Sequence, residues 1–283
     1  MGKLEGKIAL VIGSIENIGL ATAKQFVNEG AYVFISGDRE TELAAAVKEI
    51  GRSVVAVQAE ASNVGDLDRL FSQIKRETGK LHIVFASAAA EKYHPLDSVT
   101  EEEYYLNFYI NVKSLFFTVQ KALPLLPDGA SIIVNASTVA SNGLGEARNA
   151  VTRLFARRWV RDLKGRRIRV NAVSPDPVET CRLNDPKPSR GTGGQRLRRG
   201  RPSTPEEIAK AVVSLSDESS DITGMELSMD GGLAHLKALA DDVPTGKRAT
   251  PSEIADAAVF LASDHSRYIT GMEWFVGTGF VEL

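Results

Sequence analysis

The chain has 283 residues, 43% of them hydrophobic and 25% charged, with a formal net charge of -2 at pH 7. This size suits one α/β domain and leaves little room for two independent domains. No apolar run approaches the roughly 20 residues that cross a bilayer, so we expect a soluble, cytoplasmic protein with no membrane partner. Cys181 is the only cysteine, which excludes an internal disulfide.

Short apolar runs alternate with amphipathic stretches. We expect strands at Ile8–Ile12, Tyr32–Ile35, Val54–Val57, Ile83–Ala86, Ile132–Asn135 and Ile168–Val173, and helices at Leu20–Asn28, Glu40–Ile50, Val64–Glu77, Tyr104–Leu126 and Val151–Lys164. This alternation predicts an α/β fold, a Rossmann-type doubly wound parallel sheet. Ligands of such a sheet bind beyond the carboxyl ends of its strands.

The first expected strand runs into a glycine-bearing turn, Gly13–Gly19, and then into a helix. This order places backbone N–H groups and the positive end of the helix against a pyrophosphate. The sequence therefore predicts a dinucleotide-binding turn.

A basic segment follows between Arg148 and Arg201, with a local charge excess of about +12. One interpretation is a solvated helix face and a flexible basic loop. The other is contact with an anionic ligand or an acidic surface. Nucleic acid is not an expected partner, because no aromatic residues interleave the basic run.

The last third of the chain contains an internal repeat: the pattern of Thr204–Glu226 recurs over Thr250–Glu273. Each copy has a Thr-Pro helix start followed by a short strand. We assign residues 1–235 to a core that includes the first copy, and residues 236–283 to a second copy packed on the core or at a subunit interface. We expect the first copy to supply the last helix and strand of the sheet.

Taken together, these segments resemble the short-chain dehydrogenase/reductase family over nearly the whole chain. The resemblance rests on landmarks in family order, namely Gly13 with Gly19, Asn111, Asn135–Thr138, Arg169–Asn171, Ser174–Thr180 and the Thr-Pro-Glu-Glu-Ile helix start. It implies a nicotinamide cofactor held by Gly13, Ser14, Ile15, Asn17, Ile18, Gly19, Asp38, Arg39, Glu60, Ala61, Ala88, Val178 and Thr180. It also implies a homo-oligomer, since Phe155 and Trp159 lie on the helix that packs subunits together in this family. The alternative is that both residues belong to the core.

The cofactor preference depends on the residues after the second expected strand. Gly37 stands where the family has its NAD-selecting acid, and Arg39 can meet a 2′-phosphate. Asp38 and Glu16 would both repel that phosphate. NADP(H) is favoured over NAD(H), and the alternative that no cofactor binds stays open.

The family's Tyr-x-x-x-Lys pair is missing: Gly145 stands in the tyrosine position and Asn149 in the lysine position. Tyr109 and Lys113 have the same spacing, but on a different helix, and we attribute that to chance. The resemblance leaves Asn111 and Ser137 as catalytic candidates, with Thr138 if the register shifts by one. Alternatively, both hydroxyls only cap the strand end.

Carbonyl reduction needs a positioned proton donor, whereas an iminium cation accepts hydride without one. Asp176 replaces a glycine beside the expected nicotinamide and can stabilise a cation or act as a base, although a capping role in the loop is the alternative. The run Pro175–Pro177 resembles reductive Diels–Alderases of fungal prenylated indole alkaloid pathways. This resemblance implies NADPH-dependent reduction of a cyclic iminium followed by intramolecular cycloaddition.

Two other functions compete with this one. The first is a cofactor-free cyclase or isomerase that uses the nucleotide cleft for its substrate. The second is a non-catalytic pseudoenzyme that acts as a partner subunit. The four histidines show no metal-ligand spacing, so we expect no metal. The expected ligand is a small molecule, cationic or alkaloid-like.

Overall fold

The computed structural model describes residues 2–13, 15–87, 98–136, 143–175, 203–217 and 221–229. The chain divides into two compact units, residues 1–231 and 232–283. The second unit lies wholly outside the described residues, so the expected packing of residues 236–283 stays a prediction.

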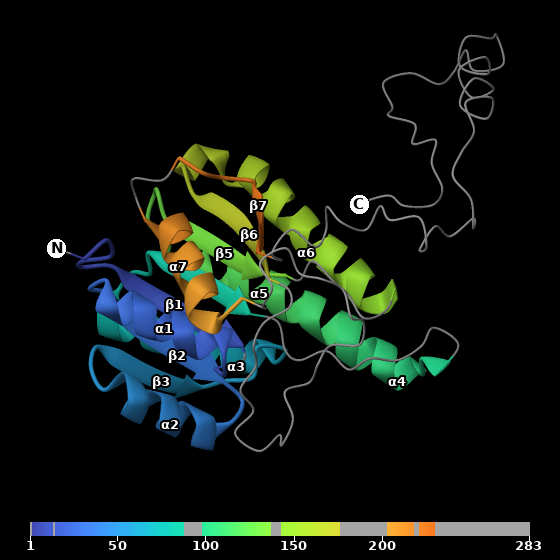
Figure 1. The fold of residues 1–283 in the computed structure, drawn as a ribbon, viewed down its shortest axis with the longest axis horizontal. Coiled ribbons are helices and arrows are strands. Elements are labelled where there is room, and N and C mark those ends of the chain that lie inside the picture. Colours follow the sequence, from blue (N-terminus) through green and yellow to red (C-terminus); the bar gives the residue numbers. More distant parts are fainter. Residues whose placement is uncertain are drawn as a thin grey trace, which may run out of the picture. The chain divides into compact units, whose positions relative to one another are not determined.

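A seven-stranded sheet forms the centre of the first unit, in the order β3-β2-β1-β4-β5-β6-β7, with every neighbouring pair parallel (Figure 1). Its strands are β1 (Ile8–Gly13), β2 (Tyr32–Gly37), β3 (Val54–Gln58), β4 (Ile83–Ser87), β5 (Ser131–Asn135), β6 (Arg169–Pro175) and β7 (Glu226–Met229). The order reverses direction at β1 and β4, which is the switch point where ligands of doubly wound sheets bind. The Rossmann-type prediction is confirmed.

Helices cover both faces of the sheet. They are α1 (Ile18–Asn28), α2 (Glu40–Ile50), α3 (Val64–Thr78), α4 (Glu101–Tyr104), α5 (Asn111–Ala122), α6 (Gly143–Asp162) and α7 (Pro205–Ser216), with a π-helical turn η2 (Tyr105–Ile110) and a 3₁₀ turn η3 (Lys164–Arg166). Leu10 and Ile12 of β1 join an apolar cluster with α3, α5 and α6, while Ala9 and Val11 join a second cluster with α1, α2 and α7. Successive side chains of a strand point to opposite faces, so both faces are buried.

The single helix expected over Tyr104–Leu126 is divided into three parts. A capping box of Thr100 and Glu103 starts α4, η2 follows, and α5 begins at Asn111. A π-turn carries one more residue per turn than an α-helix, and such turns occur often at functional sites. Sequence periodicity could not reveal this, because η2 still reads as helix. Likewise α6 begins at Gly143, eight residues before the expected start.

The first repeat copy completes the sheet, as predicted. Thr204 and Glu207 form a capping box around Pro205 at the start of α7, and Glu226 begins β7 next to β6. Proline suits the first turn of a helix because its missing N–H has no helical partner there.

Part of the basic segment serves the fold. Arg166 donates to the backbone carbonyl of Leu123 at 3.0 Å, Arg169 donates to the carbonyl of Asp217 at 2.9 Å, and Arg153 forms an ion pair with Glu226. Charge-assisted bonds of this kind fix α7 and the loop before β5. In the described part of the chain, no helix is both long and apolar enough to span a membrane.

Candidate functional site

A cleft of about 300 Å³ opens at the carboxyl ends of the central strands. Its walls come from the ends of β1, β2, β4 and β5, from the segment after β3, and from α5 and α6. The lining residues are Ile12, Gly13, Glu16, Gly37, Asp38, Arg39, Ala59, Glu60, Ala61, Ser62, Ala86, Ser87, Ile110, Asn111, Ser114, Leu115, Thr118, Asn135 and Thr152. The cleft therefore lies where the strand order predicts a ligand site.

Gly13 allows the turn after β1 to pass close to β4. Its φ is +111°, and a Cβ atom at this position would lie 1.9 Å from the carbonyl oxygen of Ser87. No side chain fits there. Only glycine gives both the conformation and the close approach.

Asn17 lies in the turn between Gly13 and Gly19 and has φ 46° and ψ -107°, with no capping bond from its side chain. A positive φ is uncommon outside glycine, and asparagine tolerates it better than most residues. The turn thus keeps a glycine-like backbone at the cost of local strain.

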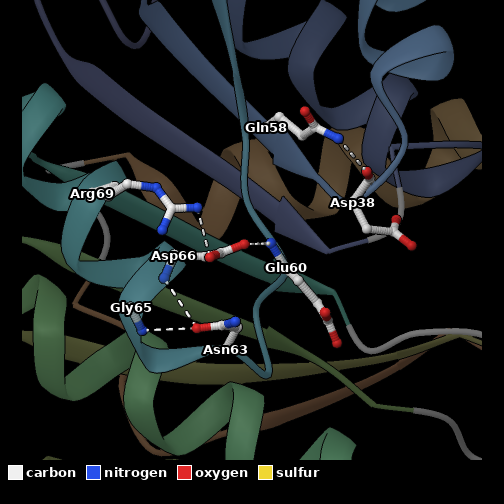
Figure 2. Close-up of polar contacts among 7 residues, drawn as sticks. All are labelled: Asp38, Gln58, Glu60, Asn63, Gly65, Asp66 and Arg69. Carbon is white, nitrogen blue, oxygen red and sulfur yellow. Dashed lines mark hydrogen bonds and ion pairs between the residues drawn. The ribbon is translucent and has the colours of Figure 1, made fainter.

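The wall after β3 is held by a network of hydrogen bonds (Figure 2). The N–H of Glu60 donates to Asp66 Oδ2 at 3.0 Å, and Asn63 caps α3 by accepting from Asp66 N at 3.3 Å. Arg69 Nη2 lies 2.6 Å from Asp66 Oδ1. The Glu60 N–H bond and the nearby Arg69 lower the pKa of Asp66 below its ordinary value.

A second contact links this wall to the neighbouring strand. Gln58 Nε2 donates to the backbone carbonyl of Asp38 at 2.9 Å (Figure 2). The loops that follow β2 and β3 are therefore fixed relative to each other before any ligand arrives. Asn63 had a recognisable signal in the sequence, an N-cap before an amphipathic helix, whereas Gln58 and Asp66 had none.

Arg39 lies among three carboxylates at the outer end of the cleft. Its guanidinium is 3.7 Å from Glu16, 4.0 Å from Asp38, and also in contact with Glu42. Partial burial and the nearby Glu16 raise the pKa of Glu42, against the lowering effect of Arg39. Arg39 and the three carboxylates together carry a net negative charge. This charge would repel a 2′-phosphate bound at the outer end of the cleft.

Polar side chains line the inner end of the cleft. Asn111, at the start of α5, is 7% exposed, and Thr152 of α6 is 6% exposed. Asn135 Nδ2 donates to Ser87 Oγ at 3.2 Å, and Asn135 Oδ1 is a buried acceptor without a partner among the described residues. Buried polar atoms without partners are uncommon and often mark a ligand or water position.

Gly145 and Asn149, which the sequence resemblance assigns to the tyrosine and lysine positions of the family pair, lie on α6. Gly145 offers no side chain, and Asn149 is 2% exposed, with an amide Nδ2 that has no partner in the described part of the chain. Arg148, 6% exposed, donates to Asn149 Oδ1 at 3.2 Å. A buried amide thus lies beside a buried guanidinium on this part of α6.

No described tyrosine lines the cleft. Tyr104, Tyr105 and Tyr109 are about half exposed, and Tyr32 lies at the start of β2. Lys113 Nζ lies 6.0 Å from the centre of the Tyr109 ring. Tyr93 and Tyr268 lie outside the described residues.

The structure brings some of the sequence-predicted site residues together at the cleft and places others elsewhere. Those that line it are Gly13, Asp38, Arg39, Glu60, Ala61 and Asn111. Ile15 and Gly19 are buried in the fold, Ile18 packs partly against the second cluster, and Asn17 shapes the turn. The predicted residues outside the described part are Ser14, Ala88, Ser137, Thr138, Asp176, Val178 and Thr180.

Thr152 and Ser114 were missed by sequence reasoning. Both lie on helices for which the sequence pattern indicates only packing, and the sheet order alone brings them to the cleft. A nicotinamide dinucleotide fits this donor set, given the Gly13 cradle, the fixed Glu60 wall and the unpartnered acceptor on Asn135. In the described residues, no three His, Cys, Asp or Glu side chains form a group able to hold a metal ion.

Comparisons with known proteins agree with this geometry. A family described as "Enoyl-(Acyl carrier protein) reductase" matches residues 13–234 and matches again over residues 234–281. Oxidoreductase asL5 of Sarocladium schorii is 38% identical over 244 residues, covering 83% of this chain and 98% of the relative. The 3-oxoacyl-[acyl-carrier-protein] reductase FabG of Thermotoga maritima is 33% identical over 244 residues, covering 82% of this chain and 99% of the relative.

A solved structure shows the same arrangement. A blue fluorescent protein from a metagenomic library, solved in complex with NADPH, superposes with a TM-score of 0.74 at 27% identity. The match covers 82% of this chain and 99% of that protein. The chain therefore shares its fold with a protein that was solved in complex with NADPH.

Proposed function

Because the chain belongs to the short-chain dehydrogenase/reductase family, we propose that it is an oxidoreductase of natural-product biosynthesis that delivers hydride to a cyclic iminium substrate. One observation carries this proposal. On α6, Asn149 is buried as an amide, and Gly145, about one turn before it, offers no side chain. We assign these two positions to the family's lysine and tyrosine. A substrate that needs no proton from the protein suits such a site.

The cofactor is proposed to lie along the cleft. Gly13 and the Asn17 turn would hold the pyrophosphate, Glu60 and Ala61 would contact the adenine side, and Asp38 with Arg39 would meet the ribose. When bound, a reduced nicotinamide supplies the hydride. We propose NADP(H), with the NADPH complex of the structural neighbour and the position of Arg39 in support.

The substrate chemistry follows from charge. An iminium C=N bond that gains hydride at carbon becomes a neutral amine, so its positive charge disappears along the reaction. Asp176 directly follows Pro175, the last residue of β6, and its carboxylate is proposed to stabilise the cation. Intramolecular cycloaddition after the reduction is the finer form of this proposal.

A second candidate is reduction of a carbonyl group, and buried Arg148 favours it. Its guanidinium lies beside Asn149, and its backbone carbonyl accepts from Thr152, which lines the cleft. A fixed positive charge can stabilise a developing oxyanion without giving up a proton, and water would then supply the proton. The same charge opposes a cationic substrate.

Two measurements test these proposals. NADPH and NADH are titrated separately while nicotinamide fluorescence is recorded; a saturable signal is expected, and its absence would favour a cofactor-free cyclase. If in addition no small molecule raised the melting temperature, the pseudoenzyme hypothesis would gain, because a ligand of the native state stabilises it.

The holoprotein is then assayed with a cyclic iminium and with a matched ketone. We expect turnover of the iminium and its loss in Asp176→Ala, with an unchanged circular dichroism spectrum. Asp185→Ala is the control, since it removes another carboxylate from the same basic segment. Turnover of the ketone alone would replace the iminium proposal with carbonyl reduction.

A further inference from the structure

The last helix and strand of the fold occupy a position that we call the terminal seat: the β6 edge of the sheet and the side of α1 that contacts α7. The hydrogen bonds between the seat and this unit are made mostly to the backbone of the unit. Asn171 donates to the carbonyl of Ile222 at 2.9 Å and accepts from the N–H of Met225 at 3.2 Å. Arg169 donates to the carbonyls of residues 215–217. Backbone groups are common to all sequences, so these bonds set no requirement on the unit's side chains.

Thr223 and Glu226 are side chains of the unit that bond directly to the seat. Thr223 Oγ1 accepts from the N–H of Val170 at 3.1 Å. Glu226 accepts from Ser174 Oγ at 2.8 Å and pairs with Arg153 at 3.5 Å. The seat therefore selects for a threonine and a glutamate, three residues apart, after the helix.

The second copy of the repeat meets both requirements. It carries Thr270 and Glu273 at the corresponding positions, and Thr250, Pro251 and Glu253 repeat the capping sequence of α7. The segment that joins helix and strand is one residue longer, residues 263–268 against 217–221.

The buried face of the helix also agrees between the copies. In α7 this face is Ile208, Ala209, Val212, Val213, Leu215 and Ser216. The second copy has Ile254, Ala255, Ala258, Val259, Leu261 and Ala262 in the same order. Four of the six are identical and two are smaller, so no larger side chain has to enter the core. Overpacking, the usual obstacle to such a substitution, therefore does not arise on the helix face. In the strand, Trp274 takes the position of the partly buried Leu227 and is the one large change against the core.

We propose that residues 250–276 are an alternative occupant of the terminal seat and exchange with residues 204–229 of the same chain. Residues 176–249 would form the tether, which is ample for the exchange. The second family match, over residues 234–281, supports the same assignment from sequence. The Sarocladium relative aligns over 98% of its length with only 83% of this chain, so part of this chain has no counterpart in that alignment.

Exchange would alter the neighbourhood of the site. Met229 pairs with Pro175, the residue before Asp176. With the second copy in place, Val276 would take the position of Met229. The chain would then have two forms that differ beside the loop proposed to carry the reaction.

Four full-length chains test whether the second copy can replace the first. They are the wild type, Ile208→Asp, Ile254→Asp and the double variant. Ile208 is fully buried, so a carboxylate there expels the first copy. We expect Ile208→Asp to keep a cooperative thermal transition and a native circular dichroism spectrum, because the second copy replaces the first. Ile254→Asp alone should match the wild type, and the double variant should lose the transition. Loss of the transition in Ile208→Asp alone would overturn the proposal.

Disulfide trapping observes the exchange directly. Val173 pairs with Leu227, and the second copy has Trp274 at the corresponding position. In a Cys181→Ser background, Val173→Cys is combined with Leu227→Cys or with Trp274→Cys. Both pairs should close within one chain, and Ile208→Asp should raise the yield of the second pair severalfold. If the second pair closes only between chains, or in neither background, the proposed exchange is wrong.

Discussion

The carbonyl oxygen of Ser87 lies 1.9 Å from the point where a Cβ atom of residue 13 would be, so the end of β4 closes directly over Gly13. This contact joins the two strands that flank the switch point of the sheet. The cleft therefore requires glycine at position 13, because only a hydrogen atom fits where a side chain would be.

Gly13→Ala should therefore destabilise the fold by about 3 kcal/mol or more, because overpacking and the positive φ both add to the cost. Gly51→Ala is the matched control: Gly51 also has a positive φ, +80°, but a Cβ atom at this position would meet nothing within 4 Å. That variant should lose only about 1 kcal/mol. Urea unfolding measures both, and equal losses would show that the Ser87 contact is not the cause.

Asn17→Gly should stabilise the protein, since Asn17 holds φ 46° and ψ -107° without a capping bond. Release of about 1–3 kcal/mol of strain exceeds the about 0.5–1 kcal/mol that glycine costs in entropy, so the net gain is about 1 kcal/mol. Dinucleotide binding should tighten as well. Asn17→Ala should be destabilising in the same denaturation assay. If Asn17→Gly were no more stable than the wild type, the backbone of Asn17 would not be strained.

The sequence was sufficient for the sheet and for much of its outer cleft. Each of these features has a local signal in the sequence. Apolar runs indicate the strands, Gly13 indicates the turn, and the Thr-Pro pair indicates the helix start of the first repeat copy. Thr152 and the partners of Arg39 could not be predicted in this way. Their roles depend on which segments the strand order brings together, and on the π-turn before Asn111, which leaves no periodic signal.

The discrimination between NADPH and NADH should depend on pH through Glu42. Its pKa is raised by burial and by Glu16, so Glu42 takes up a proton at a higher pH than an ordinary glutamate as the solution is acidified. Neutral Glu42 no longer forms an ion pair with Arg39, so the Arg39 guanidinium becomes available to a 2′-phosphate. NADPH affinity relative to NADH should thus increase as pH falls through the pKa of Glu42.

Glu42→Gln should remove that part of the pH dependence and favour NADPH at neutral pH. Glu40→Gln, an exposed position in the same first turn of α2, is the control, because the ion pairs of Arg39 in the described part of the chain are with other carboxylates. Titration of the phosphate itself is common to all three proteins and cancels in the comparison. Parallel profiles for Glu42→Gln and the wild type would exclude Glu42 as the cause.

Restoring the family pair by Gly145→Tyr with Asn149→Lys should not produce a good ketone reductase. A lysine at position 149 would bring a second cation beside Arg148 in a site where Asn149 is 2% exposed. We expect a loss of about 1–3 kcal/mol in unfolding free energy, partly recovered by adding Arg148→Met. Strong ketone turnover by the double variant would instead show that the cleft is ready for ordinary family chemistry.

Assembly of the protein into a homo-oligomer is proposed to use the outer face of α5 and α6. Leu154 of α6 is 62% exposed and Phe116 of α5 is 37% exposed. The Phe116 ring lies 5.9 Å from that of Phe155, which stacks on Trp159 with centres 4.9 Å apart. Exposed apolar patches of this kind are typical of interaction surfaces.

Leu154→Asp should shift the protein toward monomers in light scattering. The new carboxylate can pair with Arg158 one turn along the helix, so the helix itself keeps its stability and unfolding does not explain the shift. Ile222→Asp, an exposed apolar position far along the chain and outside α6, serves as the control. The two variants should differ in mass, since only Leu154 belongs to the α5–α6 face; if both keep the wild-type mass, subunits do not pack through this face.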